Sequence, residues 1–200
     1  MKRLIFDVST NVMYVGLIEY EDLVDFSIRY AQRDHAKYLV DRIDQLLRRN
    51  QITISEVDEI IIGHGPGSYT GLRIAVMVAK MLGYTKDIPV KTISSLLFMT
   101  SGYEQKVAAM IDARRGNVFS AVYHQGKTIL EDALRSLDDF RKEKAYQEAE
   151  TVFINDDTYK INPLIIINHA IPVTNIHDLV PNYLRKTEAE MTYDQKSKNK

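Results

Sequence analysis

Asp7, Ser9 and Thr10 are the first residues of the chain whose types and spacing could support chemistry. They follow the apolar run 4–6, which predicts a short buried strand that ends in a polar turn. Such a turn is polar enough to contact a phosphate. The alternative is that the Asp7 carboxylate accepts hydrogen bonds from the backbone of its own turn. We expect this structural role for Asp7, and at most weak nucleotide binding by the three residues.

A second candidate is the glycine motif, which we define as residues 63–75, GHGPGSYTGLRIA. It stands between the isoleucine run 60–62, which predicts the end of a buried strand, and a long apolar helix. A strand, a glycine turn and a helix N-terminus together form the usual geometry for binding an anion. The glycines can instead allow a close approach of backbones at a tight connection. Either Ser68 or Thr70 can cap the helix that follows.

The known phosphate and nucleophile fingerprints do not fit this motif. A Walker A loop has Lys and then Ser or Thr after its last glycine, but Gly71 is followed by Leu72 and Arg73. A dinucleotide-binding motif would have its third glycine at Thr70. A nucleophile elbow needs glycine two positions before its serine, whereas here the glycine stands directly before Ser68. The spacing therefore favours a capped turn that packs a helix tightly against a sheet.

The histidines show no metal-ligand spacing. None forms an H-E-x-x-H pattern or an i,i+4 pair. The five are His35, His64, His124, His169 and His177. The chain has no cysteine, which excludes disulfides, thiolate zinc sites and cysteine nucleophiles. We therefore expect no metal site, and surface or capping roles for the histidines.

The composition limits the possible partners and location. A length of 200 residues suits one large α/β domain or two compact lobes. A net charge of −1, from 26 basic and 27 acidic residues, gives no global field that would indicate nucleic-acid binding. The N-terminus lacks the apolar core of a signal peptide, and no apolar run approaches the roughly 20 residues of a membrane span. We expect a cytoplasmic protein that does not contact membranes.

Hydrophobic periodicity predicts two similar halves of alternating strands and helices. The expected elements of the first half are strands over 4–8, 12–18, 23–30 and 60–63, a helix over 35–49 capped by Asp34, a helix over 70–84, a strand after 88–90 and a short helix capped by Ser94. Those of the second half are strands over 107–112, 117–123, 127–130, 151–154 and 164–167, a helix from Ser136 to about 150, and a helical stretch over 175–184. Asp112 ends its strand 105 positions after Asp7 by the numbering, and a repeat of this length indicates a duplicated domain.

The helix over 70–84 is apolar nearly all round, with only Arg73 and Lys80 charged. Such a helix must be covered on most sides. Either its own domain surrounds it, or a partner buries the face that carries Arg73, Met77, Lys80 and Tyr84.

Four parts of the sequence resemble the bacterial TsaB (YeaZ) family: the glycine motif, Asp7-x-Ser9-Thr10, Asp112-Ala113-Arg114, and Pro181-x-Tyr183-Leu184-Arg185-x-x-Glu188-Ala189. The resemblance covers almost the whole chain. Its specific part is Gly65, Pro66, Gly67, Ser68, Tyr69, Thr70, Gly71, Leu72 and Arg73, whereas the Asp hairpins are shared by the actin, sugar-kinase and Hsp70 superfamily. It implies a duplicated ribonuclease-H-like α/β fold of that superfamily, with an N-terminal lobe over 1–103, a smaller C-terminal lobe over 104–190 and a polar tail over 191–200.

The same resemblance implies a non-catalytic scaffold in tRNA modification. The chain would dimerise with a TsaD-like transferase, which moves threonylcarbamoyl to N6 of the adenosine next to the anticodon, and a TsaE-like ATPase would join the pair. ATP and magnesium would be used by these partners, and this chain would require no cofactor. It would meet tRNA indirectly through the complex and would form homodimers when alone.

The resemblance also carries expectations for individual residues. In active members of the superfamily, the carboxylate equivalent to Asp7 orients metal-bound nucleotide. In TsaD-like proteins a metal-binding His-x-x-x-His falls at Ser95 and Met99, neither of which holds a hard catalytic metal, so we expect no catalytic residue. The contact with the transferase is expected on the first two helices of the N-terminal lobe, at Tyr38, Arg42, Arg73, Met77, Lys80, Met81 and Tyr84.

Two other functions stay open on the sequence alone. One is a nucleotide-dependent kinase or acyltransferase of the same fold, using Asp7, Ser9 and the glycine motif, although 200 residues leave little room for substrate-binding insertions. The other is a metallopeptidase, for which the ligands are missing. The segment Pro181-x-Tyr183-x-Arg185 is expected to pack back on one of the lobes.

Overall fold

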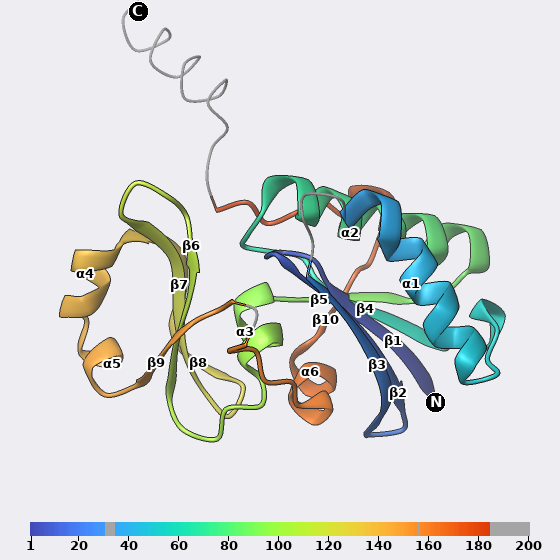
Figure 1. Cartoon of the computed structure of the whole chain (residues 1–200), viewed down its shortest axis with the longest axis horizontal. Helices are drawn as coiled ribbons and strands as arrows, with labels where there is room; N and C mark the ends of the chain where they lie inside the picture. Colours follow the sequence, from blue (N-terminus) through green and yellow to red (C-terminus); the bar gives the residue numbers. More distant parts are fainter. Residues whose placement is uncertain (31–34, 156, 185–200) are drawn as a thin grey trace, which may run out of the picture.

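The computed structural model describes residues 1–30, 35–155 and 157–184, which form a mixed α/β fold with two sheets (Figure 1). The six-stranded sheet has the order β10-β5-β4-β1-β2-β3 and the four-stranded sheet the order β8-β7-β6-β9. The strands of the first are β1 (Lys2–Asp7), β2 (Val12–Glu19), β3 (Asp22–Tyr30), β4 (Glu59–Gly63), β5 (Val90–Ile93) and β10 (Ile171–Pro172). The strands of the second are β6 (Val107–Asp112), β7 (Asn117–His124), β8 (Lys127–Ser136) and β9 (Glu150–Phe153).

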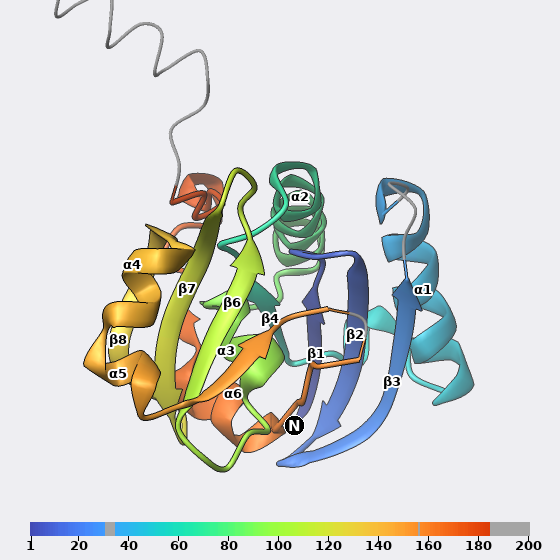
Figure 2. The same cartoon turned by 60° about the vertical axis from the view of Figure 1, so that its left-hand side comes forward.

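The helices lie in three layers around the two sheets. Their bounds are α1 (His35–Arg49), α2 (Tyr69–Lys86), α3 (Ser95–Thr100), α4 (Leu137–Lys142), α5 (Lys144–Gln147) and α6 (Pro163–His169), with 3₁₀ turns η1 (Ile54–Glu56) and η2 (Ile176–Asp178). One core joins α1 and α2 to the outer face of the first sheet, a second fills the space around α3 and α6, and a third lies under α4 and α5. Figures 1 and 2 show α3 between the two sheets.

The pattern of side chains explains these layers. Along β1, Leu4 and Phe6 pack into the core under α1 and α2, whereas Ile5 points into the core around α3. Successive side chains of a strand point to opposite faces, so a strand with both faces covered is apolar throughout. The isoleucine run in β4 is buried on both faces for the same reason.

Four strands of the first sheet pair in the same order as the four strands of the second. Strands β1, β2 and β3 pair antiparallel in sequence, and β4 joins β1 in parallel. Strands β6, β7 and β8 pair antiparallel in sequence, and β9 joins β6 in parallel. The two-residue strand β10 pairs with β5, so residues 171–172 belong to the first sheet although the predicted boundary assigns them to the second lobe.

A buried ion network ties together the starts of three strands. The carboxylate of Glu59, 4% exposed, lies 3.0 Å from Nε of Arg3 and 2.7 Å from Nζ of Lys91. These residues come from β4, β1 and β5, so the network fixes the end of the sheet that lies away from the glycine motif.

Most elements of the first half are confirmed, and three predictions in the second half are wrong. The predicted strand 164–167 is α6, because Asn162 accepts hydrogen bonds from the amides of Leu164 and Ile165 and Pro163 opens the first turn. The predicted helix from Ser136 is two short helices separated at Glu143, and only η2 is helical within 175–184. The predicted cap Asp34 and the tail 191–200 lie outside the described residues.

Candidate functional site

The glycine motif is a joint that presses the start of α2 against the turn after β1. A β-carbon on Gly71 would lie 1.9 Å from the carbonyl oxygen of Val8, and one on Gly67 would lie 2.4 Å from that of Ser9. The amide of Ser68 donates to the Ser9 carbonyl at 2.6 Å. The Ser68 hydroxyl accepts from the amide of Gly71 at 3.3 Å and caps α2, which confirms one of the two predicted caps. The glycines are therefore required by the close approach of two backbones.

The glycine motif covers two of the three residues predicted to bind a nucleotide, and Thr10 is half-buried. Asp7 is 0% and Ser9 1% exposed. Oδ1 of Asp7 accepts hydrogen bonds from the Ser9 amide at 2.8 Å and from its hydroxyl at 2.6 Å, while Thr10 accepts from the amide of Val12. The structure thus brings the three residues together in one turn. The Ser9 hydroxyl donates to Asp7 within that turn, and the glycine motif packs over it.

The second oxygen of Asp7, Oδ2, has no hydrogen-bond partner among the described residues. A β-carbon on Gly63 would lie 1.8 Å from it, so the carboxylate is wedged against the end of β4. Burial raises the pKa of Asp7 from 3.8 to about 6, and hydrogen bonds from Ser9 oppose the rise. Ser95 lies close enough to oppose it as well, but its hydroxyl accepts from the Gly65 amide and does not reach Oδ2 in hydrogen-bonding geometry.

A C-terminal strap, residues 171–184, lies over β5, α2 and the glycine motif. The amide of Asn182 donates to the carbonyl of His64 at 2.8 Å, and the ring of Tyr183 stacks on Tyr69 with centroids 4.6 Å apart. Nζ of Lys80 donates to the carbonyl of His177 at 2.7 Å. The predicted packing of this segment on a lobe is confirmed for residues 181–184, whereas Arg185 lies outside the described residues.

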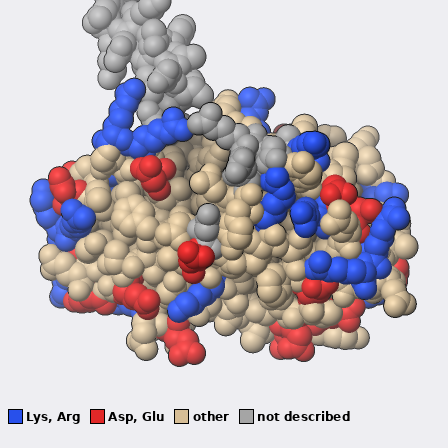
Figure 3. All heavy atoms as spheres, in the orientation of Figure 1, with Lys and Arg blue, Asp and Glu red and all other residues tan. Residues whose placement is uncertain are grey.

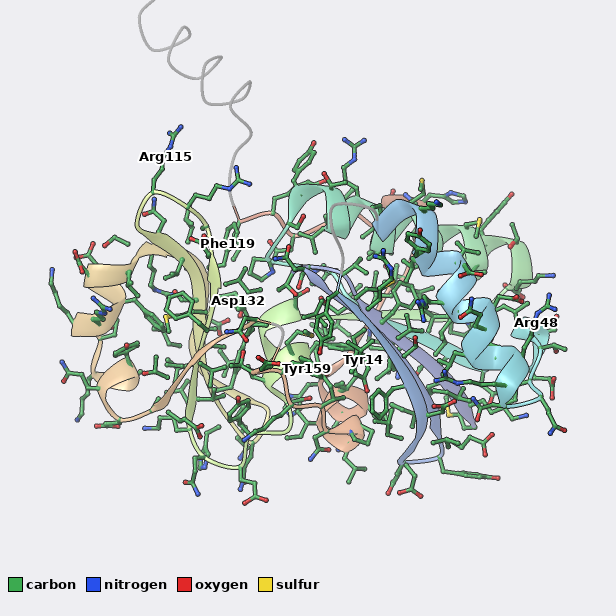
Figure 4. All side chains as sticks on the ribbon, viewed as in Figure 1. Tyr14, Arg48, Arg115, Phe119, Asp132 and Tyr159 are labelled. Carbon is green, nitrogen blue, oxygen red and sulfur yellow. The ribbon has the colours of Figure 1, made fainter. Side chains whose placement is uncertain are left out.

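A hydrogen-bonded cluster of Ser94, Tyr123 and Asp132, which we call the inter-sheet cluster, connects the two sheets. The Ser94 hydroxyl donates to Oδ2 of Asp132 at 2.5 Å and lies 3.0 Å from the Tyr123 hydroxyl, which donates to Oδ1 of Asp132. Ser94 also caps α3. Asp132 lies on the side of the second sheet that faces α3 (Figure 4). No sequence pattern indicates this cluster, because its members come from the end of β5, from β7 and from β8.

Burial raises the pKa of both acidic groups in this cluster. For Asp132 the hydrogen bonds from Ser94 and Tyr123 and the charge of His64 oppose that rise, and the charge of Glu131 adds to it. For Tyr123 the Asp132 carboxylate adds to the effect of burial. The contact between Asp132 and Tyr123 thus favours a charged Asp132 carboxylate that accepts the hydrogen bond and a neutral Tyr123 phenol that donates it.

The residues predicted to contact a partner have different surroundings. On α2, Met77 is 63%, Met81 45% and Tyr84 67% exposed, and Arg73 is exposed beside them. We call these four residues the α2 face. Lys80 is held by the strap, Tyr38 is half-buried under the guanidinium of Arg29, and Arg42 is half-buried. The remaining apolar side chains of α2 are mostly packed inside the fold, so its own domain covers one side of the helix and leaves the α2 face open.

Other chemistry finds few groups to support it in the part of the chain that is described. No set of three or more His, Asp or Glu side chains there is placed to hold a metal ion. Nδ1 of His64 lies 3.0 Å from the carbonyl of Ile93, and the ring of His177 packs on Tyr84. Ser95 and Met99 are both fully buried. None of the described helices is long and apolar enough to cross a membrane.

Comparison with known proteins finds relatives of similar sequence and similar structure. Residues 29–162 match the family model of TsaD, tRNA N6-adenosine threonylcarbamoyltransferase. The tRNA threonylcarbamoyladenosine biosynthesis protein TsaB of Bacillus subtilis is 25% identical over 99% of this chain and 100% of its own length. TsaB of Haemophilus influenzae is 34% identical over 58% of this chain, an alignment that spans 51% of that protein. The solved structure of YeaZ from Pseudomonas aeruginosa, 24% identical, superposes with a TM-score of 0.73 over 92% of this chain and 99% of that one.

Proposed function

Because the chain belongs to the TsaD family, and within it to the TsaB (YeaZ) proteins of tRNA threonylcarbamoyladenosine biosynthesis, we propose that it is a non-catalytic scaffold for a TsaD-like transferase. The transferase would move the threonylcarbamoyl group to N6 of the adenosine next to the anticodon. This chain would bind that enzyme through the α2 face. A TsaE-like ATPase would join the pair, and ATP and magnesium would be used by the partners in the cytoplasm.

The observation that carries this proposal is the double effect of the glycine motif. It packs on the turn that holds Asp7 and Ser9, which leaves neither side chain exposed for a phosphate. It also starts α2 at Ser68, so that one side of the helix packs on the first sheet and the other carries exposed Met77, Met81 and Tyr84. An apolar strip of this kind on the surface is typical of an interaction site. We propose that the strip pairs two copies of the chain when no transferase is present.

Two further features are consistent with this function. The equal pairing order of the two sheets supports a duplicated fold of the actin, sugar-kinase and Hsp70 superfamily, in which nucleotide lies between the two lobes. In this chain the inter-sheet cluster links the two lobes directly by hydrogen bonds. On the face shown in Figure 3, basic side chains are interspersed with acidic ones and form no extended basic surface. This mixture supports a contact with tRNA that is indirect, through the complex.

Reconstitution tests the proposal. Modification of tRNA would be measured with TsaD, TsaE and threonylcarbamoyl-adenylate, with and without this chain, while the chain alone would be assayed for ATP turnover and peptide cleavage. We expect modification to depend on the chain and the chain alone to be inactive. Turnover of ATP by the isolated protein, lost on mutation of Ser9, would instead support the kinase or acyltransferase interpretation.

A further inference from the structure

The inter-sheet cluster is attached to the glycine motif by a continuous set of hydrogen bonds. Ser94 lies between Ile93 and Ser95, and both of these neighbours bond to the motif. The amide of His64 donates to the Ile93 carbonyl at 3.1 Å, and the amide of Ser95 donates to the Gly65 carbonyl at 2.8 Å. The Gly65 amide in turn donates to the Ser95 hydroxyl at 3.0 Å. A displacement of Ser94 therefore cannot leave the start of the glycine motif unchanged.

Asp132 accepts the hydrogen bond that Ser94 donates to the second sheet, and Tyr123 of the same sheet lies beside both. The step from Ser120 to Val122 on β7 is matched by the longer step from Ala133 to Leu130 on β8, so β8 carries one extra residue beside Asp132. Such a bulge changes which face of the sheet a side chain points to. Here the carboxylate points toward the first sheet, where it accepts from Ser94 while Tyr123 of its own sheet occupies its other oxygen.

We propose that Asp132 is a positioning residue: through Ser94 it fixes the junction of β5 and α3, and through that junction the glycine motif and the α2 face. A residue of the second sheet would thereby determine the position of the α2 face, which lies on the far side of the first sheet. This inference rests on the proposed function for the identity of the partner. Its structural part, the link from Asp132 to the glycine motif, stands on the hydrogen bonds alone.

The test uses two conservative variants that each weaken the cluster, Tyr123→Phe and Asp132→Asn. The matched control is Asp139→Asn, because Asp139 accepts a hydrogen bond from the Ser136 hydroxyl at 2.7 Å and both residues lie within one exposed helix cap. Amide signals of Gly65, Gly67 and Gly71 would be followed by NMR. Binding to the transferase would be measured by calorimetry, and thermal unfolding would confirm that each variant is folded.

We expect both cluster variants to shift the glycine amide signals and to weaken transferase binding by about 2- to 30-fold, the range seen when residues outside an interface modulate coupling. The control should change neither. Glycine signals that stay in place in the cluster variants would overturn the link, and shifted signals with unchanged affinity would overturn its effect on the α2 face. If the unmodified chain does not bind the transferase at all, the proposed function fails, while the NMR result still decides the link.

Discussion

Replacement of Asp7 by asparagine should stabilise the protein at neutral and alkaline pH. Folding buries this carboxylate completely and leaves Oδ2 without a hydrogen-bond partner among the described residues. The pKa of about 6, against the ordinary 3.8, means that the charged form is disfavoured in the folded state. At about 1.4 kcal/mol per pH unit the difference corresponds to about 3 kcal/mol. An asparagine keeps the oxygen that accepts from Ser9 and carries no charge to bury.

The sign of the pH dependence follows from the raised pKa. Between about pH 4 and pH 6 the folded chain holds a proton on Asp7 that the unfolded chain has lost, so the free energy of unfolding falls as the pH rises through this interval. Below pH 3.8 the carboxyl is protonated in both states, so its burial carries no charge penalty, and above pH 6 the full penalty for burying the charge lowers the stability. Asp7→Asn should remove this dependence, and at pH 8 it should raise the free energy of unfolding by up to about 3 kcal/mol.

Urea unfolding followed by circular dichroism at pH 5 and pH 8 would measure both effects. Asp22→Asn, the same change at an exposed position at the start of β3, is the control. If Asp7→Asn lowers stability at pH 8, or if its difference from the unmodified chain is the same at both pH values, the reasoning from burial is wrong. The variant also bears on function: a scaffold should stay active in the reconstituted modification, whereas an enzyme that orients nucleotide with Asp7 should lose activity.

Three further substitutions test the joint, the partner surface and the ion network. Met77→Glu should weaken binding to the transferase at least about tenfold in calorimetry. It should not change the melting temperature, because the Met77 side chain is 63% exposed. The control Tyr20→Glu changes another exposed residue, far along the chain from α2, and should bind normally. Gly71→Ala should lower the free energy of unfolding by more than about 3 kcal/mol, because the new β-carbon meets a backbone oxygen. The control is Gly116→Ala, where φ is +74° and the space around the β-carbon is open. In the same urea titration it should lower the free energy of unfolding by about 1 kcal/mol. Glu59→Gln should lower the free energy of unfolding by about 3 kcal/mol, because the partly buried cations of Arg3 and Lys91 lose their counter-charge. A loss within the error of the titration would contradict this.

Lys80 illustrates how a surface prediction changes once the fold is known. Its charge on an apolar helix suggested a contact with a partner, and the sequence contains no sign that a segment about 100 residues later would reach it. The structure directs its ammonium group to the carbonyls of His177 and Leu179. Lys80→Glu would therefore disturb the strap together with any interface, so Met77 is the cleaner probe of the α2 face.

The elements that sequence reasoning predicted well are those with long regular patterns. Helix α1 and most strands of the two meanders have periodic apolar positions, and their predicted bounds agree closely with the structure. The exception is β8, predicted over 127–130, which continues to Ser136. Helix α6 failed because a short apolar run fits a strand or a helix equally, although Asn162 and Pro163 together form a helix-start signal that would have decided it. The burial of Asp7 and the meeting of Ser94 with Asp132 depend on tertiary packing and on a β-bulge, neither of which leaves a local pattern.

The C-terminal strap has a consequence for the order in which the chain can fold. Strand β10 borders β5, so residues 171–172 complete a sheet that begins at residue 2, and Asn182 bonds to the glycine motif. During synthesis the N-terminal part must wait, with the edge of β5 and the top of the motif uncovered, until almost the whole chain has left the ribosome. Contacts so distant in sequence slow folding and prolong the time during which an open strand edge can associate wrongly. A fragment that ends near residue 103 would lack β10 and keep that edge permanently open, so the first half of the chain cannot complete its own sheet without the second.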